Sequence, residues 1–134
     1  MKSITQKDAL GCGIACVAFV VNCSYQDAKK NFFKNFNEKK GLYCKDIVKA
    51  FEKAKKEYGY KKVKAKKQFK ENTIVFIKSS ERYPYGHYLA KYKEGWMDSW
   101  INFPKEKSLK KAESGFRKKL PGKAVYEIFP LERK

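Results

Sequence analysis

The sequence predicts one α+β domain over residues 1–134, in which helices come first and an antiparallel sheet follows. Two observations predict this class. Apolar residues recur at helical spacing in the first half, and short apolar runs separated by turn residues fill the second half. A third observation, the aromatic content of 16%, indicates a packed core even though 34% of the residues are charged.

The first expected helix covers Ile14–Val21, a run that is apolar on every side and therefore suits a fully buried helix. Its length alone leaves a strand open as the alternative. Gly11-Cys12-Gly13 is expected to form a flexible turn in front of this helix, and Asn22-Cys23-Ser24 to end it.

Two more helices are expected before residue 60. Ser24 is a plausible N-cap, and with Asp27 it forms a variant of the capping box for a helix over Tyr25–Phe36, with apolar positions at Ala28, Phe32 and Phe36. Gly41 then breaks the chain, and a third helix is expected over Tyr43–Tyr58, with Gly59 as its stop and an inner face formed by Ile47, Phe51, Ala54 and Tyr58.

The first expected strands follow the third helix. Val63 and Ala65 alternate with lysines over Tyr60–Gln68, a pattern typical of an edge strand that charge protects from further pairing. Thr73–Lys78 is the best candidate for a central strand because it is apolar and β-branched.

The remaining strands are expected to form a hairpin and a final strand. Tyr88–Tyr92 and Trp96–Trp100 are joined by a turn at Lys93-Glu94-Gly95. The polar stretch from Phe103 to Lys123 is interpreted as a long loop with a short helix, and Val125–Phe129 as the last strand.

The net charge is +18, from 32 basic and 14 acidic residues, and only Arg82, Arg117 and Arg133 among them are arginines. Such a charge favours an acidic partner, which could be a nucleic acid, a membrane surface or an acidic protein. Proteins that read DNA bases depend on bidentate arginine, which is scarce here. The codon bias of an AT-rich genome would give much of the same composition. We therefore expect nonspecific nucleic-acid binding rather than base recognition.

No apolar run approaches the ~20 residues that a membrane span requires. The first ten residues include Gln, Lys and Asp and contain no apolar core of a signal peptide. We therefore expect a soluble, cytoplasmic protein, with a host or virion location left open. The sequence does not indicate the oligomeric state.

The four cysteines Cys12, Cys16, Cys23 and Cys44 have gaps of 4, 7 and 21 and include no CxxC pair. This spacing gives little support for a zinc site, and an intracellular setting gives little support for disulfides. Cys16 and Cys23 fit the usual role of small buried apolar residues. We expect neither a metal nor another cofactor.

Cys12 differs from the other cysteines because it precedes a buried helix and has a glycine on each side. The N-terminus of a helix presents partial positive charge and free N–H groups, which favour the thiolate form of a cysteine. The same N–H groups can hold an oxyanion together with one polar side chain. Gln6, six residues earlier, could supply that side chain.

A nucleophilic thiolate needs a base, and His87 is the only histidine in the chain. It follows Gly86 at the start of an expected strand. Pairing across the turn at 93–95 brings residues 87 and 98 near one another, so Asp98 could orient the imidazole.

These residues resemble the motifs of the C39 and C39-like papain-fold cysteine peptidases. The segment TQKDALGCGIACVAFV is similar to their N-terminal motif of a Gln, then Asp-Cys-Gly or similar, then an Ala-rich apolar helix. Gly86-His87-Tyr88 followed by Trp96-Met97-Asp98-Ser99 is similar to their later Gly-His strand, turn and Asp. Two positions depart from the family pattern: Gly11 stands where Asp is usual, and Ser99 where Pro is usual.

The resemblance implies a papain-like fold and a cysteine hydrolase that cleaves peptide or isopeptide bonds. Cys12 would be the nucleophile and His87 the general base and acid. Asp98 would orient His87, and Gln6 would donate to the oxyanion. The substrate would be a peptide or protein, and the basic surface would favour an acidic one.

Two other functions remain open. One is a catalytically silent binding protein of the same fold that uses its basic surface for nucleic acid or an acidic protein. The other is a different acyl chemistry on the same triad, such as amidase, transglutaminase-like or deubiquitinase activity. Josephin-type deubiquitinases also combine Gln, Cys and a Gly-His strand with an aromatic-rich hairpin, and Trp96-Met97-Asp98 is compatible with that group.

Overall fold

The computed structural model describes residues 1–65 and 68–131. This part of the chain is α+β, as the sequence predicts, and its helices precede most of its strands. The helices are α1 (Cys12–Val21), α2 (Tyr25–Phe32) and α3 (Cys44–Lys53), with a short 3-10 helix, η1 (Leu109–Lys111), near the end. The strands are β1 (Tyr58–Lys62), β2 (Ile74–Ile77), β3 (His87–Tyr92), β4 (Gly95–Asp98), β5 (Gly115–Arg117) and β6 (Ala124–Pro130).

The six strands form one sheet in the order β1-β6-β2-β3-β4-β5, and every neighbouring pair is antiparallel. The predicted hairpin is confirmed, because Tyr92 pairs with Gly95 at the turn between β3 and β4. The predicted edge strand and central strand are present as β1 and β2, although β1 is shorter than the range 60–68. Residues 66 and 67 of that range lie outside the described residues.

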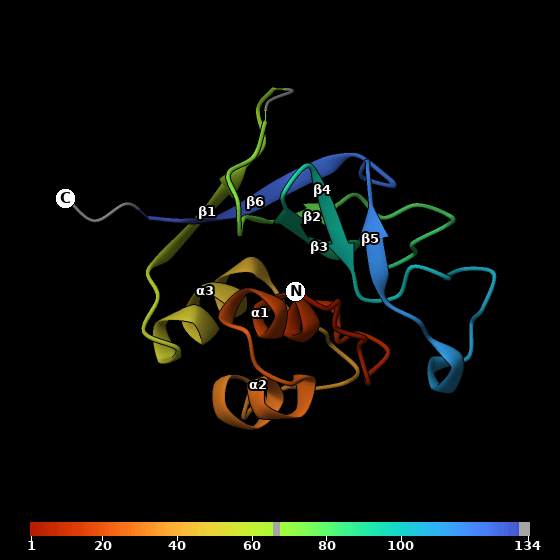
Figure 1. Cartoon of the computed structure of the whole chain (residues 1–134), viewed down its shortest axis with the longest axis horizontal. Coiled ribbons are helices and arrows are strands. Elements are labelled where there is room, and N and C mark those ends of the chain that lie inside the picture. The colour runs from red at the N-terminus through yellow and green to blue at the C-terminus, as the bar shows by residue number, and fades with distance from the viewer. Residues whose placement is uncertain (66–67, 132–134) are drawn as a thin grey trace.

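α1 and α3 cover one face of the sheet, and α2 packs on these two helices from the outside (Figure 1). α1 is the central helix of this layer and is apolar throughout, with Ile14 to Ala18 fully buried. It contacts β3 and both other helices. The opposite face carries a smaller cluster of Val75, Ile77, Tyr83, Leu89 and Trp96. This arrangement places the N-terminus of α1 at the sheet, next to the start of β3.

The boundaries of all three helices differ from the predictions. α1 begins at Cys12, so the expected turn at 11–13 is already the first turn of the helix. α2 ends at Phe32, and Phe33 rather than Phe36 is buried. α3 ends at Lys53 because the chain turns at Lys55, which has a positive φ of 65°. Tyr58 therefore belongs to β1, yet it still stacks on Phe51 at 3.7 Å between ring centroids.

Two predictions for the second half were wrong. The expected loop from 103 to 123 contains the predicted short helix, as η1, but it also contains β5, which pairs with β4 through Met97 and Phe116. Trp100 is not in a strand with Trp96, because β4 ends at Asp98. Among the described residues, none of the helices has both the length and the apolar character needed to cross a bilayer.

Candidate active site

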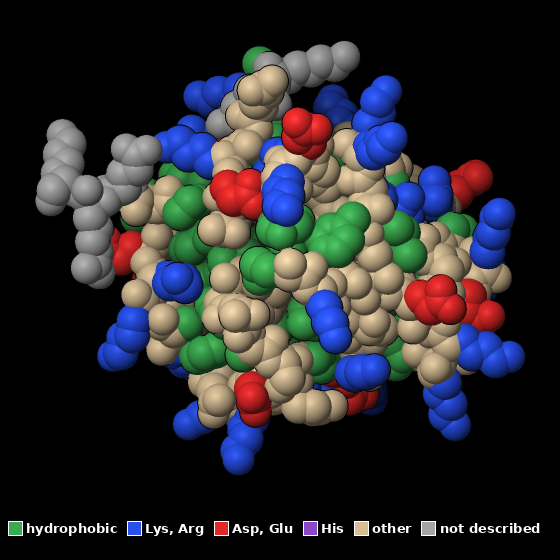
Figure 2. All heavy atoms as spheres, viewed as in Figure 1, with side chains coloured by type: hydrophobic (Ala, Val, Ile, Leu, Met, Phe, Trp, Pro, Cys, Tyr) green, Lys and Arg blue, Asp and Glu red, His purple; other side chains and the backbone are tan. Residues whose placement is uncertain are grey.

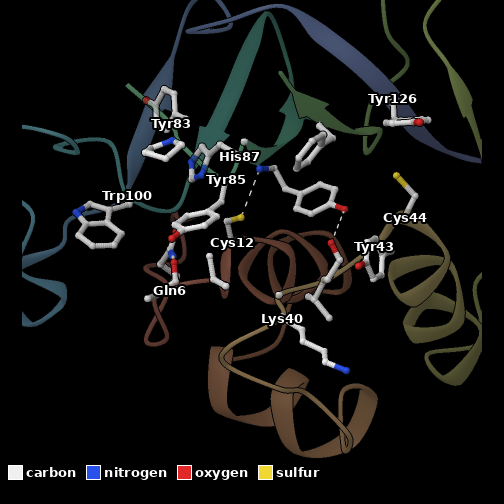
Figure 3. A pocket seen from close by; sticks show the side chains of 18 of the residues that line it. Gln6, Cys12, Lys40, Tyr43, Cys44, Tyr83, Tyr85, His87, Trp100 and Tyr126 are labelled. Carbon is white, nitrogen blue, oxygen red and sulfur yellow. Dashed lines mark hydrogen bonds between the residues drawn. The ribbon is translucent and has the colours of Figure 1, made fainter. Parts of the chain in front are cut away.

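Cys12 is the first residue of α1, and the helix N-terminus at Gly11 has no side-chain cap. The backbone N–H of Tyr88, on β3, donates a hydrogen bond to the Cys12 sulfur at 3.4 Å. Figure 3 shows Cys12 and His87 in the same cleft, and hydrogen bonding with Cys12 is one of the causes that raise the pKa of His87. The sulfur therefore lies beside an uncapped helix N-terminus, whose free N–H groups can also bind an oxyanion.

Gly11 departs from the family pattern for a steric reason. A Cβ at this position would collide with the hydroxyl of Tyr25. That hydroxyl donates to the buried carboxylate of Asp8 at 2.7 Å, and Lys29 pairs with the same carboxylate at 3.0 Å. The loop before Cys12 is therefore anchored to α2, and only glycine fits at the point of closest approach.

His87 lies at the start of β3 and is 6% exposed. Its Nε2 lies 2.7 Å from Oδ1 of Asp98, so the predicted closeness of residues 87 and 98 is confirmed. Burial alone would lower the pKa of His87, but hydrogen bonding to Asp98 and Cys12 outweighs burial and raises the pKa to about 10. With Nε2 bound to Asp98, the other ring nitrogen is left for Cys12.

Asp98 is fully buried and is held by more than the histidine. Oδ1 also accepts the backbone N–H of Trp100 at 3.0 Å, and Oδ2 accepts Nε–H of Arg117 at 2.6 Å. Burial alone would raise the pKa of Asp98, but bonds from His87 and Arg117 hold it below its usual range. Arg117 was not predicted as a site residue, because it lies on the unpredicted strand β5. The only feature of the sequence that could have drawn attention to it is the scarcity of arginine.

Gln6 lies at the cleft and is 2% exposed. Its Oε1 accepts the hydroxyl of Ser99 at 2.7 Å, a contact that proline could not make. Its Nε2 donates to the carbonyls of Asp8, at 2.9 Å, and Ala9, at 3.1 Å. Gln6 is thus held between the end of β4 and the loop that leads to Cys12.

A cleft of about 910 Å³ runs past Cys12 and His87. Figure 3 shows Gln6, Tyr83 and Trp100 on one side of Cys12, and Lys40, Tyr43, Cys44 and Tyr126 on the other. The described residues that line the cleft include four lysines and no aspartate or glutamate; the lysines are Lys39, Lys40, Lys45 and Lys107. Outside the cleft, lysine and arginine side chains are spread over the visible face rather than gathered in one stripe (Figure 2).

The other three cysteines differ from Cys12 in their surroundings. All four thiols are free, and burial raises the pKa of the Cys16, Cys23 and Cys44 thiols. Within the described residues, no group of three or more His, Cys, Asp or Glu side chains could hold a metal ion. Cys12 is the one that lies beside an imidazole.

A family model described as the peptidase C39 family matches residues 1–126 of the chain. No curated protein and no solved structure matches the chain. The matched range covers both ends of the cleft and the strands that carry His87 and Asp98.

Proposed function

The chain belongs to the peptidase C39 family, and we propose on this premise that it is an active cysteine peptidase with a papain-like architecture. Cys12 is the nucleophile, His87 the general base and acid, and Asp98 the residue that orients His87. The observation that carries the proposal is the pairing of Cys12 at the start of α1 with a histidine whose Nε2 is bound to a buried carboxylate.

In the first half of the reaction the Cys12 thiolate attacks the carbonyl carbon of the substrate and forms a C–S bond. The carbonyl electron pair moves to oxygen and gives a tetrahedral oxyanion. The imidazolium of His87 then donates its proton to the leaving nitrogen, the C–N bond breaks, and an acyl thioester remains on Cys12. The raised pKa of His87 supports this role, because it keeps the imidazole protonated until the leaving group needs a proton.

In the second half His87 accepts a proton from water as the water attacks the thioester. The C–S bond breaks, the carboxylic acid leaves, and the thiolate and imidazolium are restored. The oxyanion of each step is held by the N–H groups at the start of α1 and by Gln6. Nε2 of Gln6 donates to the carbonyls of Asp8 and Ala9. In the proposed step the oxyanion takes the place of the Ala9 carbonyl, which accepts the longer of these two hydrogen bonds.

The substrate class follows from the cleft. Aromatic rings and aliphatic side chains form most of its wall, and apart from Cys12 and His87 its charged side chains are lysines. We infer that it takes a peptide segment with apolar side chains and carboxylates. Four cations without a compensating carboxylate favour an anionic segment over a cationic one, and the preference weakens as salt is added.

The proposal is tested by mapping how fast each cysteine reacts. The native protein is treated with limiting iodoacetamide from pH 5 to 9, and every cysteine is quantified by mass spectrometry. Cys23 is an internal control because it follows the other end of α1 and is also partly exposed. We expect selective labelling of Cys12 at pH 6 and a loss of this selectivity in His87→Ala.

Activity is then measured on a peptide library, with Cys12→Ala as the blank. Cleavage of Glu-containing peptides over otherwise identical Lys-containing peptides supports the inferred substrate class. Equal, slow labelling of all accessible cysteines, rising only near the free-thiol pKa of ~8.5, would contradict catalysis and favour a silent binding protein. Selective labelling without peptide cleavage would point to another acyl transfer on the same residues.

A further inference from the structure

His87 and three neighbouring side chains form a closed ring of contacts. Asp98 binds His87 through Oδ1 and Arg117 through Oδ2, at 2.7 and 2.6 Å. Arg117 also donates from Nη2 to the hydroxyl of Tyr83 at 3.3 Å and to the carbonyl of Ile101 at 3.1 Å. The ring of Tyr83 stacks on the imidazole of His87, with centroids 5.0 Å apart and planes within 10°. The imidazole is therefore fixed at its edge by Asp98 and at its face by Tyr83.

Arginine is the side chain that can make these contacts. Its guanidinium donates in several fixed directions and stays charged when buried, whereas lysine offers a compact point charge. The chain has three arginines against 29 lysines (32 basic residues in all), and Arg117 is half-buried with its donors directed at three different acceptors. The other basic side chain near Tyr83, Arg82, lies over the ring at 5.5 Å and makes no such bridge to Asp98 in the contacts described.

We propose that Arg117 and Tyr83 are positioning residues that hold the Asp98–His87 pair in register with Cys12 and limit how strongly Asp98 retains the proton of His87. This inference rests on the proposed function. Neither residue touches the reacting atoms; Arg117 acts through Asp98, and Tyr83 through the face of the imidazole.

The electrostatic argument depends on the groups that face His87. These are Cys12 from α1, Asp98 from β4 and the phenol of Tyr83, with Arg117 of β5 behind Asp98. The thiol of Cys16 is also close to Asp98 but remains protonated, because burial raises its pKa well above the usual range. Asp98 alone would hold the imidazolium strongly. A permanent positive charge on its other oxygen offsets part of that attraction, so His87 can release its proton to a leaving group.

The experiment uses the fact that His87 is the only histidine. Its imidazole is titrated by NMR in a Cys12→Ala background, alone and with Arg117→Gln, Arg117→Lys or Lys118→Gln added. Lys118→Gln is the matched control because it removes the same charge from the next, exposed residue. We expect Arg117→Gln to raise the proton affinity of His87 about tenfold. Arg117→Lys and Lys118→Gln should each change it less than about twofold.

Positioning is tested in the chain that retains Cys12. Arg117→Lys keeps the charge and Tyr83→Phe keeps the ring, but each loses the bond between Arg117 and Tyr83. Both should slow iodoacetamide labelling of Cys12 at pH 6 by about threefold to tenfold, whereas Lys118→Gln leaves it unchanged. Two-dimensional NMR spectra confirm that each variant is folded, and the Lys and Phe variants keep the test available if Arg117→Gln does not fold.

The outcomes separate this inference from the proposed function. A titration of His87 that is the same in Arg117→Gln and Lys118→Gln would overturn the electrostatic role. Unchanged labelling in both Arg117→Lys and Tyr83→Phe would overturn the positioning role. An unreactive Cys12 in the native protein would instead reject the peptidase proposal, and the His87 titration could still be measured.

Discussion

Cys12 and His87 reach the cleft from two regions that are stabilised in different ways. α1, which carries Cys12, is fixed by apolar packing, and its first two turns after Cys12 are fully buried without a charged side chain. His87 is fixed by Asp98 and Arg117, a buried carboxylate and a guanidinium. Cys12 is thus positioned by apolar packing and His87 by charge. Substitutions in the first region should change mainly stability, and those in the second mainly the chemistry.

The largest effect is expected from Asp98→Asn, which keeps the size of the side chain and removes its charge. The imidazole loses its anionic partner, its pKa falls, and the wrong tautomer faces Cys12. Peptide hydrolysis should fall about 10²–10⁴-fold, measured as kcat/KM on a peptide found in the library. Glu127→Gln is the matched control, because it neutralises another buried carboxylate on β6. An equal loss in both variants would contradict the conclusion that the charge of Asp98 acts specifically on His87.

The helical region is tested by Ile47→Ala. Ile47 is fully buried on α3, and its side chain lies against Gly13, where it leaves little room for a Cβ. Ile47 therefore packs against the start of α1. The cavity should lower the free energy of unfolding by about 2–5 kcal/mol, measured by urea denaturation. The pH profile of Cys12 labelling in the folded variant should stay as in the native chain. A shifted profile would mean that packing also sets the chemistry.

The charge interactions of His87 should also make the free energy of unfolding depend on pH. The pKa of His87 is about 10 in the folded chain, against an unfolded value near 6.5. Its contribution to the free energy of unfolding is therefore complete below about pH 6.5 and is lost as the pH rises through about 10. Between pH 6.5 and 10 the native chain should lose up to about 4 kcal/mol more than His87→Asn. Urea denaturation of both chains across this range measures the difference, and parallel curves would contradict it.

The smallest effect is expected at Ser99, where the two regions meet. Ser99→Ala removes the hydroxyl that binds Oε1 of Gln6, so the amide of Gln6 is less firmly held. The value of kcat should fall by about threefold to tenfold, with KM nearly unchanged, because in the proposed mechanism Gln6 acts only on the oxyanion. Ser108→Ala, at an exposed serine, serves as the control. A change in KM alone would mean that Gln6 shapes the cleft rather than the oxyanion site.

The same contrast explains what could be predicted from the sequence. The position of Cys12 in front of a buried helix followed from the apolar run after it, although the length of that run alone left a strand open. The nearness of His87 and Asp98 followed from the register of a hairpin with a clear turn. The helical periodicity through Tyr58 was misleading, because a strand residue can fill the same place on Phe51 that a helix residue would.

Other features left too little trace to be predicted. β5 has three residues and no alternation of apolar and polar side chains, so it could not be told from a loop. A single arginine in a lysine-rich stretch has the pattern of a solvated surface charge, and only the folded sheet brings Arg117 to Asp98. Likewise, glycine is needed at position 11 because a Cβ there would collide with the hydroxyl of Tyr25, which is fourteen residues away in the sequence.

The place of β6 in the sheet has a consequence for synthesis of the protein. β6 is the last strand in the chain, yet it lies between β1 and β2 and pairs with both. During translation β1 therefore has no strand to pair with until residues 124–130 have emerged, although His87 and Asp98 are made earlier. Long-range closure of this kind is slow, and it delays cooperative folding of the sheet until β6 is available. The sheet around His87 and Asp98 is therefore incomplete until β6 has joined it.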